Sequence, residues 1–275
     1  MKSILFTALL ITVMSGAFLQ SVVAQTDTSG VIVKDTTIVK KKKFSASWDY
    51  RNKRDSSKRD ITTKKPYEPG FVGGITLSRI DLGFSRLIDN GSFKLSAPND
   101  FLDYKDAKSS TFSFDLVDFG YRFNPNFKII VAAGFDWTMF RLKRNITIQE
   151  DQSTLAYSNE PIAFKKNRFS SSYVHVPLSF QFRTKENDRG KRVYFVVGPE
   201  VSFLLNGKVK QKSEERGKEK FRDDYNLQSV RYGGTVRLGY GSFGIFSKYY
   251  FNDMFETAAQ AGLKNMSFGV TLGLN

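Results

Sequence analysis

From Met266 to Leu274, apolar residues alternate without a break with serine, glycine and threonine. Period-two alternation is typical of a β-strand whose two faces meet different surroundings. Here one face is uniformly apolar and the other consists of the smallest residues. That combination suits a strand of a closed barrel with lipid outside and a narrow, crowded interior.

Seven earlier segments alternate in the same way, which makes eight strands in all. They lie near 71–80, 110–123, 129–139, 174–182, 193–205, 230–240 and 243–251. The phase slips around Arg79 and Ile80, which predicts a β-bulge. Pro177 removes a ladder hydrogen bond and predicts a bulge or a break in pairing. Four residues of the last strand resemble the C-terminal signal recognised by barrel-insertion machinery: Ser267, Gly269, Leu272 and Leu274.

The connections between these strands alternate in length. The short ones are 124–126, 185–191 and 241–242; the long, polar ones lie near 85–109, 144–168, 207–226 and 252–263. Outer-membrane barrels have short periplasmic turns and longer extracellular loops. The sequence therefore predicts an all-β fold over 70–275, an eight-stranded antiparallel up-and-down transmembrane β-barrel with both ends in the periplasm.

The face opposite the apolar one decides between a membrane barrel and a soluble one. It carries glycine, serine and threonine, which a narrow interior requires, instead of the lysine and glutamate typical of a water-facing exterior. It also carries seven charged or ionisable residues: Arg122, Asp136, His175, Glu200, Arg231, Arg237 and Lys248. Buried charges persist when they are paired. We predict a polar interior network in which Glu200 and Asp136 neutralise some of the arginines.

The apolar face ends in aromatic residues, as the interfacial girdles of membrane barrels do. These are Trp137, Phe182, Tyr232, Tyr240 and Tyr249. The 26 phenylalanines and 12 tyrosines of the chain fit the same interpretation.

The N-terminal residues differ in character from the rest. Residues 1–24 resemble a secretory signal peptide, with Lys2 before a short apolar run and a small-residue cleavage site at Val22–Ala24; an N-terminal membrane anchor is the alternative. Residues 25–69 are rich in lysine and arginine and poor in apolar residues, which predicts a disordered basic periplasmic extension. This extension is either a solvated tether or an arm that binds lipid phosphates, peptidoglycan or an acidic partner.

Composition limits the chemistry. The net charge of +15 would suggest a nucleic-acid partner in a cytosolic protein, but the leader segment indicates export, so we expect none. With one histidine and no cysteine we predict no metal site, no cofactor and no enzymatic activity. The alternative is a barrel hydrolase in which His175 and Asp136 or Glu200 activate water.

Several short motifs resemble the outer-membrane β-barrel domain of Bacteroidetes, the PorT-like group. They are Tyr173–Leu178, Val197–Pro199 with Leu204-Leu205, Arg237–Tyr240, and Lys248–Tyr250 with Met254-Phe255. The resemblance covers 70–275 and implies an eight-stranded outer-membrane barrel. The basic extension and the ending Leu274-Asn275, in place of a terminal aromatic, depart from that pattern.

We therefore predict a porin-like integral protein of the Gram-negative outer membrane, a monomer with a structural, anchoring or interaction role. Its expected partners are outer-membrane lipid and lipopolysaccharide, the insertion machinery, and envelope or secretion proteins. The alternatives are a PorT-like secretion or transport component, the hydrolase, and a soluble ligand-binding barrel. An eight-stranded barrel encloses little more than its own side chains, which argues against a general diffusion pore.

Overall fold

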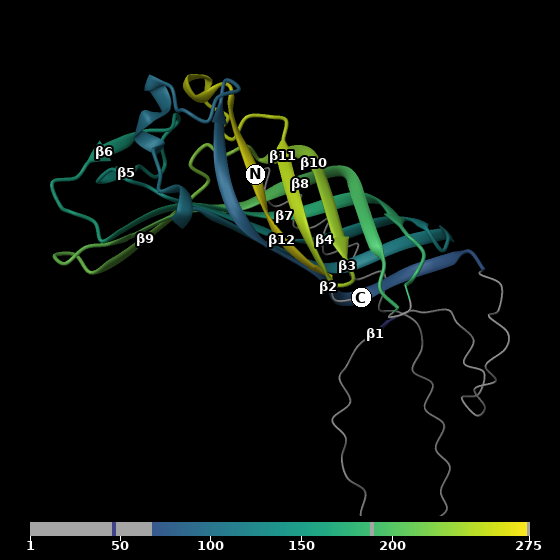
Figure 1. Cartoon of the computed structure of the whole chain (residues 1–275). Helices are drawn as coiled ribbons and strands as arrows, with labels where there is room; N and C mark the ends of the chain where they lie inside the picture. The colour runs from purple at the N-terminus through teal and green to yellow at the C-terminus, as the bar shows by residue number, and fades with distance from the viewer. Residues whose placement is uncertain (1–45, 48–67, 188–189, 274–275) are drawn as a thin grey trace, which may run out of the picture. The chain divides into compact units, whose positions relative to one another are not determined.

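A computed structural model describes residues 46–47, 68–187 and 190–273, which belong to one compact unit. Eight long strands form a closed antiparallel ring (Figure 1). They are β2 (Gly70–Asp89), β3 (Ser110–Asn124), β4 (Phe127–Arg141), β7 (Lys166–Arg183), β8 (Val193–Lys212), β10 (Val230–Tyr240), β11 (Phe243–Tyr250) and β12 (Leu263–Gly273). Each pairs with the next ring strand along the chain, and β2 pairs with both β3 and β12 to close the ring. The predicted eight-stranded up-and-down barrel is confirmed.

The two faces of the ring have opposite chemistry. On β4, inward-facing Asp136 is 2% exposed, whereas outward-facing Val131 is 45% exposed. On β12, inward-facing Thr271 is 1% exposed and its outward-facing neighbour Val270 is 50% exposed. Large apolar side chains on the outside and polar ones inside are the arrangement that a hydrocarbon surrounding favours.

Aromatic rings gather on the outer face near both ends of the ring. Near the short turns, Phe127 packs on Phe123 and Phe182 with ring centroids 5.5 and 5.0 Å apart. Toward the other end, Trp137 stacks on Phe112 at 5.6 Å. Such paired girdles mark the two interfaces of a membrane.

The strand ladders are irregular at the two places that the sequence predicts, near Arg79 and at Pro177. The register of β2 against β3 shifts between Ile75 and Arg79. On β7, the residues between His175 and Leu178, which include Pro177, make no ladder pairs with β4. On its other side Pro177 still pairs with Glu200 of β8 without a register shift. Pro177 therefore interrupts pairing and does not create a bulge.

Two glycines face each other across β2 and β12, Gly83 and Gly269. A Cβ atom on Gly269 would lie 2.2 Å from the carbonyl oxygen of Leu82, and one on Gly83 would lie 3.0 Å from the ring of Phe246. Phe246 is 4% exposed and belongs to the lumen. The facing glycines of β2 and β12 thus allow the two strands to approach closely and leave room for an aromatic ring inside a narrow barrel.

The connections predicted to be long contain secondary structure of their own. They contain 3-10 helices η1 (Ala97–Leu102), η2 (Asp106–Lys108) and η3 (Ala258–Gln260), the hairpin β5 (Ile146–Ile148) with β6 (Tyr157–Asn159), and β9 (Lys218–Asp223). Strand β9 pairs with the far half of β8, which continues to Lys212. These elements lie together beyond one end of the ring (Figure 1).

A buried apolar cluster, here called the cap, joins all four long connections. Its members are Leu87, Phe101, Leu102, Tyr104, Phe140, Leu142, Ile146, Ile148, Phe169, Val209, Tyr225, Leu227, Met254, Phe255 and Leu263. Apolar residues from separate connections are removed from water only by packing together. The cap therefore closes this end of the barrel.

The opposite end carries the short turns 124–127, 183–193 and 240–243, together with the start of β2 and the end of β12. Strand β1 (Ala46–Ser47), within the predicted extension, pairs with Ile75 and Gly74 of β2. The predicted signal peptide and the rest of the extension lie outside the described residues. Among those described, no helix is both long and apolar enough to cross a membrane.

Candidate functional site

The centre of the lumen holds an ion cluster organised around Lys248 on β11. Its ammonium group donates to Asp136 Oδ2 at 2.8 Å and lies 2.9 Å from Glu200 Oε1. The hydroxyl of Tyr250 donates to the same Glu200 oxygen at 3.0 Å. All four side chains are buried, so each charge depends on its partners for stabilisation.

Arg231 lies beside this cluster between two tyrosine rings. Its guanidinium carbon is 3.4 Å from the ring centroid of Tyr173 and 4.0 Å from that of Tyr250. One of its nitrogens is 3.8 Å from Asp136 Oδ1. Desolvated cation–π contacts of this kind stabilise a buried guanidinium in addition to the carboxylate.

A second cluster lies nearer the short turns. Arg237 donates to Asp81 Oδ2 at 2.8 Å, and Arg79 forms an ion pair with Asp115. The other oxygen of Asp115 lies 2.8 Å from His175 Nε2.

The two clusters together contain four permanent cations and four carboxylates. The cations are Arg79, Arg231, Arg237 and Lys248, and the carboxylates are Asp81, Asp115, Asp136 and Glu200. The lumen network is therefore balanced in charge.

Of the seven residues predicted for the interior network, six lie in these two clusters. Arg122 is the exception: it is less buried and lies at the short-turn rim, paired with Lys128 in the ladder. Asp136 and Glu200 do contact cations, but the partner of Arg237 is Asp81. Asp81, Asp115 and Arg79 also belong to the network and were not predicted from the sequence.

Asp136, His175 and Glu200 also bring potential metal-ligand atoms within 4.8 Å of one another. The ammonium of Lys248, however, contacts two of these three residues. It provides the positive charge that a metal ion would otherwise supply.

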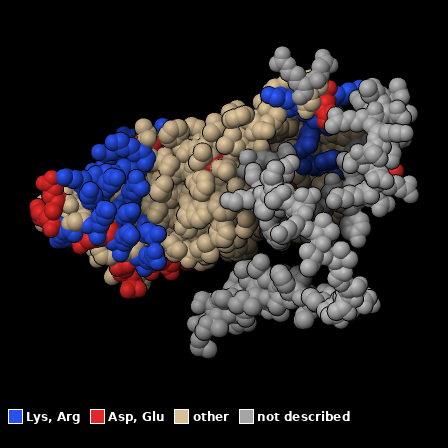
Figure 2. All heavy atoms as spheres, turned by 90° about the horizontal axis from the view of Figure 1, so that it is seen from below, with Lys and Arg blue, Asp and Glu red and all other residues tan. Residues whose placement is uncertain are grey.

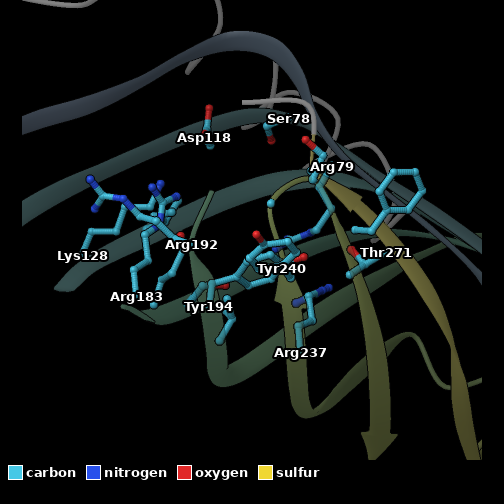
Figure 3. Close-up of a pocket in the computed structure, with 18 of the residues that line it drawn as sticks. Ser78, Arg79, Asp118, Lys128, Arg183, Arg192, Tyr194, Arg237, Tyr240 and Thr271 are labelled. Atoms are coloured by element: carbon cyan, nitrogen blue, oxygen red, sulfur yellow. The ribbon is translucent and has the colours of Figure 1, made fainter. Parts of the chain in front are cut away.

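Between this network and the short turns, the lumen opens into a cavity of about 440 Å³, here called the vestibule (Figure 3). Its basic lining residues are Arg79, Lys128, Arg183, Lys191, Arg192 and Arg237. Its acidic lining residues are Asp115, Asp118 and Glu186. The tyrosines Tyr194 and Tyr240 complete the polar part of the wall.

At the cap end, the outward side of the extended sheet is basic. Nine residues at registered positions of β4, β7, β8 and β9 form this surface, here called the basic face: Arg141, Lys166, Arg168, Lys208, Lys210, Lys212, Lys218, Lys220 and Arg222. Figure 2 shows blue atoms gathered at this end, next to the uncharged belt. Burial, Arg222 and Lys220 together lower the pKa of Lys208, which lies beyond the belt.

A family model described as the outer membrane protein beta-barrel domain matches residues 53–256. The chain belongs to this family. Two solved structures of Ail, the attachment invasion locus protein of Yersinia pestis, one with the heparin analogue sucrose octasulfate, are similar to the chain with 17% identity. They cover 72% of this chain and 95% of their own, with TM-scores of 0.32 and 0.31. A comparison with curated proteins finds no match.

Membership in the outer-membrane barrel family indicates which side of the membrane each end of the barrel faces. Short turns face the periplasm and long connections face outward. By this rule we expect the vestibule to open to the periplasm, and the cap and the basic face to lie on the cell exterior. The alternative of a soluble ligand-binding barrel is excluded by the family and by the apolar belt.

The predicted insertion signal lies on the last ring strand. Ser267 is buried in the lumen, Gly269 faces Gly83 and Leu272 pairs with Phe243 of β11. Leu274 lies outside the described residues. Recognition of this strand by insertion machinery remains a prediction.

Proposed function

We propose that this outer-membrane barrel is a non-conducting anchoring and interaction protein that binds the phosphate groups of lipopolysaccharide through its basic face. The observation that carries the proposal is the cross-strand alignment of like charges. Arg168 pairs with Lys210, which pairs in turn with Lys220; Lys212 lies between Lys166 and Lys218 in the same way. Like charges placed directly opposite destabilise a sheet, so this surface favours an anionic ligand.

No carboxylate occupies any of the registered positions of the basic face, among the residues that the structure describes. The opposite side of the same strands carries Phe169, Val209 and Gln211, which are buried against the cap. The sheet is therefore held in place by apolar packing on one side and presents only positive charge on the other.

The height of the basic face above the membrane fits lipid phosphates. Arg141 follows Trp137 of the outer aromatic girdle by four residues on β4 and pairs with Arg168. At about 3.3 Å per residue and a strand tilt of about 40°, both arginines lie roughly 10 Å above the interface. Phosphates of the outer leaflet are found in that layer, and they attract basic residues by about 1 kcal/mol each.

Binding of the detergent-folded barrel to lipopolysaccharide micelles tests the proposal. A variant with Lys210→Gln, Lys212→Gln and Lys220→Gln should bind at least about tenfold more weakly. A control with Lys94→Gln, Lys105→Gln and Lys108→Gln loses the same charge elsewhere and should bind within about twofold of the parent. Equal losses in both variants, or undiminished binding to dephosphorylated lipopolysaccharide, would contradict the proposal.

Membership of the PorT-like group, and with it a role in secretion, is a second proposal that rests on the motif resemblance. Its motifs line the barrel wall on β7, β8, β10 and β11, with Met254-Phe255 in the cap. Co-purification of envelope proteins with the intact chain, but not with a chain lacking 26–65, would support it. The hydrolase alternative has less support because the carboxylate in contact with His175, that of Asp115, is also ion-paired with Arg79 in the lumen network. His175→Ala should leave any phenotype unchanged.

A further inference from the structure

The periplasm-facing vestibule contains more positive charge than its own carboxylates neutralise. Arg79 pairs with Asp115, Arg237 with Asp81, and Arg192 with Glu186. Three lining cations remain, Lys128, Arg183 and Lys191, against the single carboxylate of Asp118.

Lys128 and Arg183 are the most unusual of these cations. Lys128 is 9% exposed, and in the described part of the chain neither side chain has a carboxylate within ion-pair distance. Three guanidinium groups, those of Arg183, Arg122 and Arg79, repel Lys128, and the single carboxylate that attracts it, that of Asp118, lies beyond ion-pair distance. A cation removed from water and placed beside like charges is costly unless an anion joins it.

The strands hold these groups on one wall. Lys128 lies on β4 and pairs with Gln181 of β7, and Arg183 follows two residues later. Figure 3 shows Lys128, Arg183 and Arg192 side by side on this wall, with Tyr194 next to them toward the centre of the cavity. A planar guanidinium and an ammonium converging in one cavity are typical of oxyanion binding.

We propose that the vestibule is a binding site for a small polyvalent oxyanion, bearing phosphate or carboxylate groups, that enters from the periplasm and is held by Lys128 and Arg183. The cavity of about 440 Å³ has the size of a small-molecule site. Its inner end is closed by the balanced lumen network and, beyond that, by the cap. The site is therefore blind, and it binds a ligand without passing it on.

Residues 25–69 are net basic, so the segment as a whole does not offset the positive charge of the vestibule. This site lies at the opposite end of the barrel from the basic face. Anion binding in the vestibule can therefore be tested independently of lipopolysaccharide binding.

Calorimetric titration of the detergent-folded full chain with pyrophosphate, and separately with citrate, tests the proposal. We expect one saturable site per barrel for at least one probe, with acetate at equal concentration failing to compete. Lys128→Gln with Arg183→Gln should weaken that binding at least about tenfold, since two charge-assisted contacts are lost. The control pair Lys94→Gln with Lys105→Gln, at the cap end, should leave it within about twofold. Absence of binding by both probes, or equal losses in the two double variants, would overturn the proposal.

If the double variant does not fold, lysine footprinting of the parent protein tests the same proposal. Acylation of lysines by an amine-reactive reagent is followed by mass spectrometry with and without the bound probe. The probe should slow modification of Lys128 severalfold and leave Lys94 unaffected. Equal modification of Lys128 in both conditions would overturn the proposal. Protection by pyrophosphate alone would assign phosphate chemistry, and protection by citrate alone would assign carboxylate chemistry.

Discussion

Replacing Lys248 by methionine perturbs the lumen network at its most connected cation. Lys248→Met keeps the length of the side chain but removes the group that contacts both Asp136 and Glu200. The network then changes from four cations and four carboxylates to three and four. Arg231, at 3.8 Å from Asp136, is the nearest remaining cation for this carboxylate.

The expected cost follows from the burial of these groups. Removing one partner of a buried ion pair leaves an uncompensated charge and costs about 3–5 kcal/mol. An exposed lysine such as Lys210 should cost less than about 0.5 kcal/mol when replaced by methionine. At about 1.4 kcal/mol per factor of ten, the two variants should differ by roughly two to three orders of magnitude in the unfolding equilibrium constant.

The assay is urea unfolding of the barrel in phospholipid vesicles, followed by heat-modifiable gel migration. The decisive comparison is a double variant, Lys248→Met with Glu200→Gln. It restores the charge balance of the network and retains Arg231 as the cation nearest to Asp136. We expect it to be more stable than Lys248→Met alone by at least about 1 kcal/mol, as coupled neighbours are. If Lys248→Met is as stable as Lys210→Met, or if the double variant loses the sum of the two single losses, the lumen is not a charge-coupled network.

Three further outcomes follow from the closed lumen and the folded exterior. Phe169→Ala in the cap should make the long connections sensitive to trypsin while the membrane ring stays heat-modifiable, because it removes buried apolar contacts there; unchanged resistance would contradict the cap. Gly269→Val should abolish refolding, whereas Gly70→Val, which has open space at its Cβ, should refold normally; equal yields would contradict the close approach of β2 and β12. In planar bilayers the parent barrel should carry no stable open-channel current, and a sustained ion current would refute its closure.

Period-two alternation was sufficient to predict the ring and its two faces. The inward position of Asp136 and Lys248 follows from strands whose phase is unbroken. Asp81 and Asp115 were missed because each lies beside an irregularity: the register shifts after Ile75 on β2 and around Leu116 on β3. A bulge moves the following residues to the other face, so simple alternation misassigns them.

The cap and the extended sheet escaped prediction for different reasons. The cap unites short apolar segments from four separate connections, none of which has a period of its own. The far half of β8 did carry a signal, since Lys208 and Lys210 alternate with Val209 and Gln211. Because charged residues are so dense there, residues 207–226 were predicted as a long, polar connection. Apolar packing against the cap provides the stabilisation that makes this segment a strand.

The central claim is that apolar side chains face lipid while the charged network fills the lumen. The chain has no cysteine, so single-cysteine variants carry one nitroxide label each. For Val131→Cys and Val270→Cys in bilayers, the label should be relaxed strongly by oxygen, which dissolves in lipid. For Ser113→Cys and Thr271→Cys, the label should be shielded from it. Equal oxygen accessibility at all four positions, or the reverse order, would contradict the account.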